Sequence, residues 1–144
     1  MIPFLTRRVR IEWAQCDPAG IVYAPRYLDI FGESTILLFE SAGLPRKRAM
    51  LAEMNVAGFP MVDVSARYLA PTSYGDDVIV ETAAPEFGNS SFTIRHRLSL
   101  DGRSCVECTE KRVWTVPDAT RPAGFRAERV PDVVRTLFER SARA

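Results

Sequence analysis

Cys16-Asp17-Pro18-Ala19-Gly20-Ile21-Val22-Tyr23-Ala24-Pro25 is the stretch that leads into the longest helical pattern of the chain. Pro18 fixes its own φ and biases Asp17 to an extended conformation, while Gly20 supplies the φ freedom of a tight turn. Pro25 suits the first turn of a helix, where its missing N–H is not required. The stretch therefore places one carboxylate on a turn facing a helix N-terminus, whose free N–H groups attract negative charge.

One long helix is predicted over residues 26–42, because this segment has no internal proline and is followed by Gly43 and Pro45. Apolar residues spread around much of its circumference, which predicts burial on most sides. Alternating polar and apolar residues predict a strand at residues 8–13 before the helix. The helix is thus expected to pack against strands that the rest of the chain supplies.

The remainder of the chain predicts four strands and two shorter helices. The strands are expected at residues 59–69, 78–84, 92–100 and 103–116, with Asp101-Gly102 as a hairpin turn. Short helices are expected at residues 45–54 and 130–141. Strands joined by short turns form antiparallel sheets, so the prediction is an α+β fold in a single domain spanning residues 1–144. Open sheet edges favour at least a dimer.

The amino-acid composition limits which partners, cofactors and cellular location are expected. The 144 residues are 47% hydrophobic and 26% charged, as in an ordinary globular protein. A net charge of +1 gives no reason to expect a nucleic-acid or membrane partner, and no apolar run approaches the length that crosses a bilayer. Three cysteines without a secretory leader favour a cytoplasmic location. A single histidine argues against a zinc site, and no metal or redox cofactor is expected.

The stretch from Cys16 to Tyr23 resembles the signature of the hotdog-fold acyl-CoA thioesterases, most closely the Asp-dependent bacterial 4-hydroxybenzoyl-CoA thioesterase family. The likeness continues at Gly43-Leu44-Pro45, Gly58-Phe59-Pro60, Tyr74-Gly75-Asp76-Asp77-Val78, Ser91-Phe92, Arg95-His96 and Arg112-Val113-Trp114. It implies a hotdog fold, in which an antiparallel five-stranded sheet wraps around one long central helix. It also implies a tetramer of two dimers and an enzyme that hydrolyses an acyl-CoA to free acid and coenzyme A.

The resemblance makes Asp17 the catalytic carboxylate, either as a nucleophile that forms a mixed anhydride or as a base on water. From the residues alone, an aspartate before Pro-x-Gly is also a common turn residue. Backbone N–H groups at Tyr23, Ala24 and Arg26 are candidate donors to the developing oxyanion. Pro25 has no N–H, and Ala24 is the donor that both the position and the family favour.

Four residues are expected to contact the substrate: Tyr23, Gly32, Gly58 and Arg126. Gly58 matches a family position that lines the site, with a simple turn glycine as the alternative, and Arg126 matches a basic position at the nucleotide end. Near Gly32 the 4-hydroxybenzoyl enzyme is expected to carry a carboxylate for the phenol hydroxyl. Glycine offers no such acceptor, which predicts a redirected specificity for a small aromatic or aliphatic acyl group.

Several alternatives stay open. Glu33 and Glu40 are fallback acids, because a related thioesterase branch carries its catalytic glutamate on the central helix. His96 lies on an apolar strand face and is interpreted as a core residue. A hotdog hydratase would need a histidine shortly after Asp17, and none follows. A non-catalytic protein that binds or senses acyl-CoA, and a thioesterase acting on acyl-carrier protein, are the other two alternatives.

Overall fold

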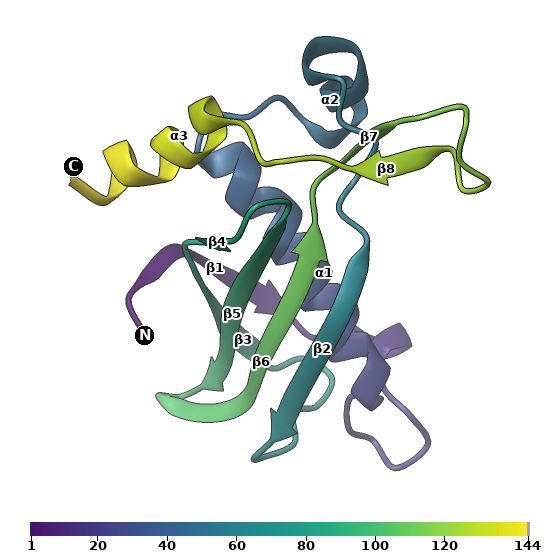
Figure 1. The fold of residues 1–144 in the computed structure, drawn as a ribbon. Helices are drawn as coiled ribbons and strands as arrows, with labels where there is room; N and C mark the ends of the chain where they lie inside the picture. The colour runs from purple at the N-terminus through teal and green to yellow at the C-terminus, as the bar shows by residue number, and fades with distance from the viewer. Residues whose placement is uncertain (144) are drawn as a thin grey trace.

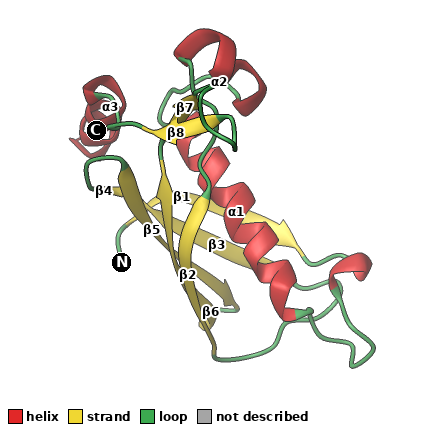
Figure 2. Ribbon diagram, turned by 45° about the vertical axis from the view of Figure 1, so that its right-hand side comes forward, coloured by secondary structure: helices red, strands yellow, loops and turns green. Residues whose placement is uncertain are grey.

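The computed structural model describes residues 1–143, with side chains as far as Glu139, as an antiparallel sheet crossed by one long helix (Figures 1 and 2). The principal strands are β1 (Pro3–Arg10), β2 (Met61–Tyr68), β3 (Asp77–Ala83), β5 (Ser91–Leu100) and β6 (Arg103–Val113). Their order in the sheet is β1-β3-β5-β6-β2, and the two-residue β4 (Glu86–Phe87) pairs with β5. The predicted α+β architecture of five strands and one long helix is confirmed, with β4 as an addition.

Strand β1 begins and ends earlier than the alternating pattern predicted. The Ile11 N–H donates to the Asp76 carbonyl at 2.8 Å, and the chain then turns into the 3-10 segment η1 (Trp13–Gln15). The Gln15 side chain accepts the Glu12 N–H at 2.8 Å, which closes that turn. Local hydrogen bonds therefore end the strand before Trp13, although the alternation continues.

Helix α1 (Ala24–Ser41) lies against the inner face of the sheet and is buried on one side. Its buried residues are Tyr27, Ile30, Phe31, Ser34, Thr35, Leu38 and Phe39. Burial on most sides was expected, but Asp29 and Glu33 are exposed while Leu28, Gly32 and Ile36 are half-buried. A single sheet covers only one side of a helix, so the opposite side of α1 is left to solvent or to another chain.

The end of the sheet near the α1 C-terminus is closed by α2 (Lys47–Met54) and α3 (Asp132–Arg143). Its core is rich in packed aromatic rings: Phe39, Phe59, Phe92, Trp114 and Phe138. The strand predicted over residues 103–116 is split at buried Trp114, beyond which β7 (Thr115–Pro117) pairs with β8 (Phe125–Ala127). No helix among the described residues is long and apolar enough to span a membrane.

Strand β2 forms an edge of the sheet, and α1 covers its inner face only in part, with the Tyr27 ring 5.9 Å from the Tyr68 ring. Val64 pairs with Glu110 of β6 and Ala66 pairs with Cys108. Glu110 and Cys108 are buried, whereas Val64 is 38% exposed and Tyr68 is 52% exposed. We call Val64, Ala66 and Tyr68 the inner β2 row. This apolar row and the unpaired edge beside it are exposed surfaces of the sheet that a second molecule can approach.

Candidate active site

Asp17 lies on a tight loop between η1 and α1 that folds back on itself. The Asp17 N–H donates to the Ile21 carbonyl at 2.9 Å, and the Gly20 N–H donates to the Asp17 carbonyl at 2.9 Å. Cys16 and Val22 form an antiparallel bridge across the base of the loop. Gly20 has a φ of +84°, in the left-handed region that favours glycine. The chain entering Asp17 therefore runs beside the chain that enters the helix.

The carboxylate of Asp17 is held on one side only. Its Oδ1 accepts the Ala19 N–H at 2.8 Å, which is the turn role that an aspartate before Pro-x-Gly often has. In the part of the chain that the structure describes, Oδ2 accepts no hydrogen bond and the half-buried side chain forms no ion pair. One oxygen orients the group, and the other is available to a ligand.

The first residue of α1 has a backbone donor, the Ala24 N–H, to which the described residues offer no acceptor. The Tyr23 N–H donates to the Gln15 carbonyl at 2.9 Å, and the Arg26 N–H donates to the Tyr23 carbonyl at 2.7 Å. Pro25 has no N–H, and the Ala24 N–H has no acceptor among residues 1–143. The Ala24 amide is thus a vacant donor at the positive end of the α1 dipole.

A mainly apolar cavity of about 320 Å³ opens beside this amide. Ile21 and Ala24 line one side of it, and Tyr68 and Leu69 line the other. Tyr27 forms the inner wall, where its hydroxyl shares a hydrogen bond of 2.7 Å with the buried Thr72 hydroxyl. An apolar cavity with few polar groups suits the hydrocarbon part of a small ligand.

Arg112 of β6 lies beside Gly32 and is hydrogen-bonded to the residue that follows Gly58. A Cβ placed on Gly32 would lie 3.4 Å from Arg112 Nη2, whereas one on Gly58 would meet no atom within 4 Å. Arg112 Nη1 donates to the Phe59 carbonyl at 2.9 Å. Arg112 therefore connects the half-buried side of α1 with the segment that contains Gly58.

Arg126 lies apart from the Asp17 loop within one chain. It belongs to the β7–β8 hairpin, at the opposite end of the fold (Figure 1). Arg126 Nε lies 3.5 Å from Asp118, and Nη2 lies 3.3 Å from Glu128. The side chain borders a separate cavity with Phe125. The structure thus groups Asp17, Tyr23 and Ala24 and leaves Arg126 with local acidic partners.

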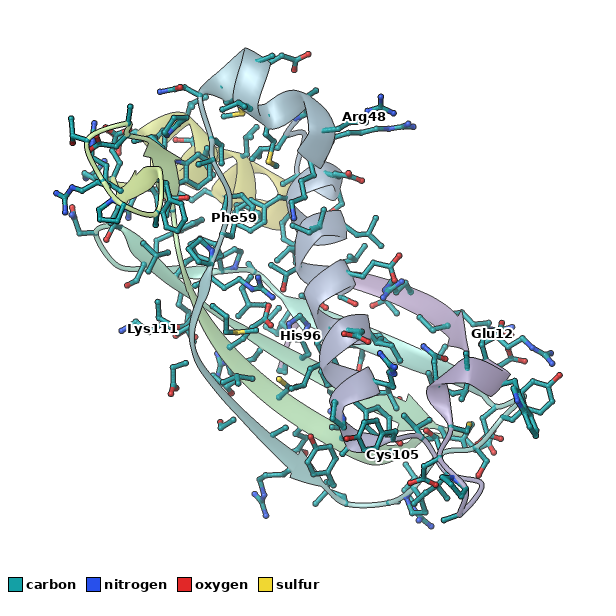
Figure 3. The ribbon with its side chains drawn as sticks, turned by 90° about the vertical axis from the view of Figure 1, so that its right-hand side faces the viewer. Glu12, Arg48, Phe59, His96, Cys105 and Lys111 are labelled. Atoms are coloured by element: carbon teal, nitrogen blue, oxygen red, sulfur yellow. The ribbon has the colours of Figure 1, made fainter. Side chains whose placement is uncertain are left out.

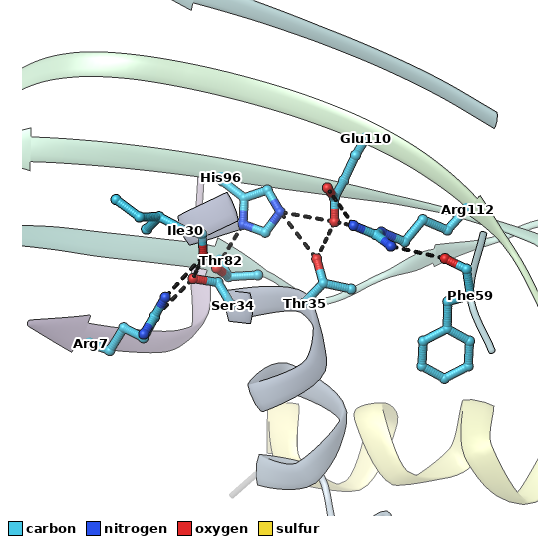
Figure 4. Close-up of polar contacts among 9 residues, drawn as sticks. All are labelled: Arg7, Ile30, Ser34, Thr35, Phe59, Thr82, His96, Glu110 and Arg112. Carbon is cyan, nitrogen blue, oxygen red and sulfur yellow. Dashed lines mark hydrogen bonds and ion pairs between the residues drawn. The ribbon is translucent and has the colours of Figure 1, made fainter. Parts of the chain in front are cut away.

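A buried polar network under α1 was not anticipated from the sequence (Figure 4). At its centre Glu110 accepts the Thr35 hydroxyl, and Arg112 Nε donates to Glu110 Oε1 at 3.0 Å. His96 Nε2 lies 3.3 Å from the same oxygen, and His96 Nδ1 lies 2.9 Å from the Thr82 hydroxyl. Figure 3 places His96 between α1 and the sheet. The imidazole is a core residue with hydrogen-bond partners on both nitrogens, as expected.

The network sets the charge of Glu110. Burial pushes the pKa of this carboxyl upward, but hydrogen bonds from His96, Arg112 and Thr35 bring the pKa below its usual value of 4.5. Glu110 is therefore an ionised, fully buried partner of Arg112. The fallback acid Glu33 instead lies on the exposed side of α1, paired with Arg7 at 3.2 Å.

Comparisons with known proteins give a consistent result. Residues 11–138 match the model of the thioesterase-like superfamily. The chain is 33% identical over 132 residues to 4-hydroxybenzoyl-CoA thioesterase of Pseudomonas sp. strain CBS-3, covering 88% of this chain and 92% of that protein. The structure of that enzyme has a TM-score of 0.85 at 32% identity, over 92% of this chain and 97% of that chain. A gentisyl-coenzyme A thioesterase has a TM-score of 0.77 at 27% identity, over 93% and 99% of the two chains.

Proposed function

The chain belongs to the thioesterase-like superfamily and is by class a thioester hydrolase, and from this premise we propose that it hydrolyses a small aromatic or aliphatic acyl-CoA to free acid and coenzyme A. The expected hotdog fold is confirmed by the same relatives. One observation carries the proposal. The carboxylate of Asp17, whose Oδ2 accepts no hydrogen bond from the described residues, lies on the loop that leads into α1, and the Ala24 amide at the start of α1 has no acceptor among the same residues.

The proposed chemistry uses these two groups on opposite sides of the thioester. The Ala24 N–H holds the carbonyl oxygen and stabilises the negative charge that develops there, with the α1 dipole adding to the effect. Asp17 either attacks the carbonyl carbon, expelling coenzyme A as its thiolate and leaving a mixed anhydride for water to open, or takes a proton from the attacking water. Both routes need the free carboxylate oxygen.

The remaining contacts are proposed from their positions. Tyr23 is 52% exposed at the entrance to α1, next to the amide that holds the carbonyl. Gly58 leaves open space beside the segment that Arg112 holds. Arg126 and Phe125 are exposed on the β7–β8 hairpin, where a cation and a ring suit the nucleotide part of coenzyme A. Binding there would require Arg126 to exchange a local acidic partner for phosphate.

The test is free-thiol release from a panel of acyl-CoAs that runs from acetyl to decanoyl and includes benzoyl, 4-hydroxybenzoyl and phenylacetyl. We expect turnover of one acyl class well above the rest. Tight binding without turnover of any member would instead favour an acyl-CoA sensor. Faster turnover of the same acyl group on carrier protein than on coenzyme A would move the proposal to that substrate.

We further propose that two copies of the chain pair through the open edge of β2, which carries exposed apolar residues and lies beside the inner β2 row. Replacing Val62, which is 56% exposed on this strand, by lysine places a charge in that interface. We expect the dimer to dissociate at least about tenfold more readily, because an ammonium group is costly to remove from water. Analytical ultracentrifugation over a concentration series measures this.

The matched control is Val133→Lys, the same substitution at a valine that is 62% exposed on α3. Its sedimentation should equal that of the wild type. If both variants dissociated equally, or if neither did, β2 would not be the interface.

A further inference from the structure

We propose that Arg112 binds the far end of the acyl group, and that this end carries an oxygen that accepts hydrogen bonds. The inference rests on the proposed function, since it names a property of that enzyme's own substrate. It makes Arg112 and Gly32 a specificity-determining pair. The first observation is a short distance: a Cβ placed on Gly32 would lie 3.4 Å from Arg112 Nη2.

The hydrogen bonds of Arg112 leave donors unused. Nε and Nη2 donate to the two oxygens of Glu110 at 3.0 and 3.3 Å, and Nη1 donates to the Phe59 carbonyl at 2.9 Å. A guanidinium group has five N–H donors, two of them on each Nη. Among the described residues, one N–H on each Nη therefore has no acceptor. The Nη2 donor belongs to the atom that lies beside Gly32.

The guanidinium group is held in place but not sealed off. Its side chain is 15% exposed, whereas its partner Glu110 is 1% exposed. Two bonds to one carboxylate and one to a backbone carbonyl fix its plane, so little conformational entropy remains to be lost when a ligand binds. A rigid, partly open donor is the arrangement expected of a recognition group.

The surfaces between Ala24 and Arg112 suit an acyl chain. Ala24, Leu28 and Gly32 follow one another at intervals of four along α1, so they lie on one side of the helix. Ala24 shares its cavity with Tyr68 at one end of β2, and Arg112 pairs with Met61 at the other end. This side of α1 therefore runs along β2, where the inner β2 row is apolar.

The order of groups along this path defines the substrate. The carbonyl-binding amide lies at Ala24, the middle is apolar, and a guanidinium donor stands beside Gly32, eight residues or roughly 12 Å further along the helix axis. An aspartate at position 32 would instead present an acceptor and would also neutralise the donor of Arg112. Glycine leaves the donor open, so the chain selects for an acceptor oxygen on the acyl group.

The experiment compares acyl-CoAs that differ only at the far end. The aromatic set is 4-methyl, 4-amino, 4-hydroxy, 4-methoxy and 4-carboxybenzoyl-CoA, and the aliphatic pair is octanoyl-CoA and the eight-carbon monothioester that ends in a carboxylate. We expect kcat/KM about 10- to 100-fold higher for acceptor-bearing members than for the methyl or amino member, as for a hydrogen bond to a charged group. The methoxy and carboxylate members tell a neutral acceptor from an anionic one.

The variants change Gly32 and leave Arg112 intact, because replacing Arg112 would leave the buried Glu110 without its counter-charge and could prevent folding. Gly32→Asp supplies an acidic partner to Nη2, and we expect the acceptor preference to fall to within about threefold of unity. Gly32→Ala adds a methyl group without an acceptor and should keep the direction of the preference. Two results would contradict the proposed role of Arg112. One is equal turnover of the methyl and methoxy members by the wild type, and the other is a Gly32→Asp variant that keeps the full preference for acceptor-bearing acyl groups.

Failure of this inference is distinguishable from failure of the proposed function. Equal turnover of every member overturns the role of Arg112 and leaves a thioesterase. Titration calorimetry of the Asp17→Asn variant with the same acyl-CoAs makes the comparison with little turnover, because this variant lacks the proposed catalytic carboxylate. A chain that hydrolysed none of them but bound the acceptor-bearing members more tightly would lose the proposed function and keep the preference.

Discussion

Replacing Asp17 by asparagine is expected to lower kcat for acyl-CoA hydrolysis by about 10²- to 10⁴-fold, the range that a positioned acid or base contributes. Asparagine keeps the side-chain shape, and its carbonyl oxygen can still accept the Ala19 N–H that orients the loop. A neutral amide neither attacks a thioester carbon nor takes a proton from water. Steady-state thiol release with the preferred acyl-CoA measures the loss.

Asp118→Asn is the matched control for this substitution. Asp118 Oδ1 accepts the Thr120 N–H at 2.9 Å in the same kind of turn, within the connection between β7 and β8 at the other end of the fold (Figure 1). Its kcat should stay within about twofold of the wild type, since the change removes no proposed catalytic group. The comparison is made on kcat and not on KM, because Asp118 is an acidic partner of Arg126, the residue proposed to bind the nucleotide. If Asp17→Asn kept full turnover with its fold and oligomeric state intact, the catalytic acid would lie elsewhere, and Glu33 would be tested next.

The sheet and α1 were predictable because their signals are local. Alternation with a period of two marks β5, where Phe92, Ile94 and Leu98 are all fully buried. The absence of proline after Pro25 and the break at Gly43 bracket α1 within two residues at its start and one at its end. Such patterns depend on neighbours in sequence, and no knowledge of the tertiary fold is needed to see them.

The second sheet could not be predicted in the same way. Strand β8 has three exposed residues and no alternation that a sequence pattern detects. It forms because the loop after Pro117 closes on itself, with the Asp118 N–H donating to the Gly124 carbonyl at 2.9 Å and Gly124 at a φ of +81°. The pairing of β7 with β8 follows from that turn. The break between β6 and β7 occurs at Trp114, whose side chain is buried in the surrounding core.

The candidate site shows the same contrast between local features, which the sequence predicts, and features that depend on the tertiary fold. The turn at Asp17 and the amide at Ala24 lie within eight residues, so turn chemistry and helix-start signals located both. The network around Glu110 joins residues far apart in the sequence, since Thr35 and Glu110 are separated by 75 positions. One signal was present in the sequence. Glu110 follows Val106 and Cys108 at intervals of two, so a charged residue falls on an apolar strand face and needs a buried partner.

Replacing that charged residue, in Glu110→Gln, is expected to destabilise the fold by about 3–5 kcal/mol at pH 7, the cost of removing one member of a buried ion pair. Glutamine has nearly the same volume but leaves Arg112, only 15% exposed, without a counter-charge. Its amide also presents donors where Thr35 and Arg112 both donate. Urea unfolding at fixed protein concentration measures the difference in free energy of unfolding.

The pH dependence of this difference separates a charge effect from a packing effect. The pKa of Glu110 is lower in the folded than in the unfolded chain, so the unfolded chain binds the proton first as pH falls. The stabilisation is complete above the ordinary pKa of 4.5 and is lost as pH falls through the lower folded-state pKa. The free energies of unfolding of the wild type and Glu110→Gln should therefore converge on acidification.

Glu107→Gln, at an exposed residue of the same strand, is the control and should change the free energy of unfolding by less than about 0.5 kcal/mol. A constant gap between wild type and Glu110→Gln at every pH would assign the loss to packing alone.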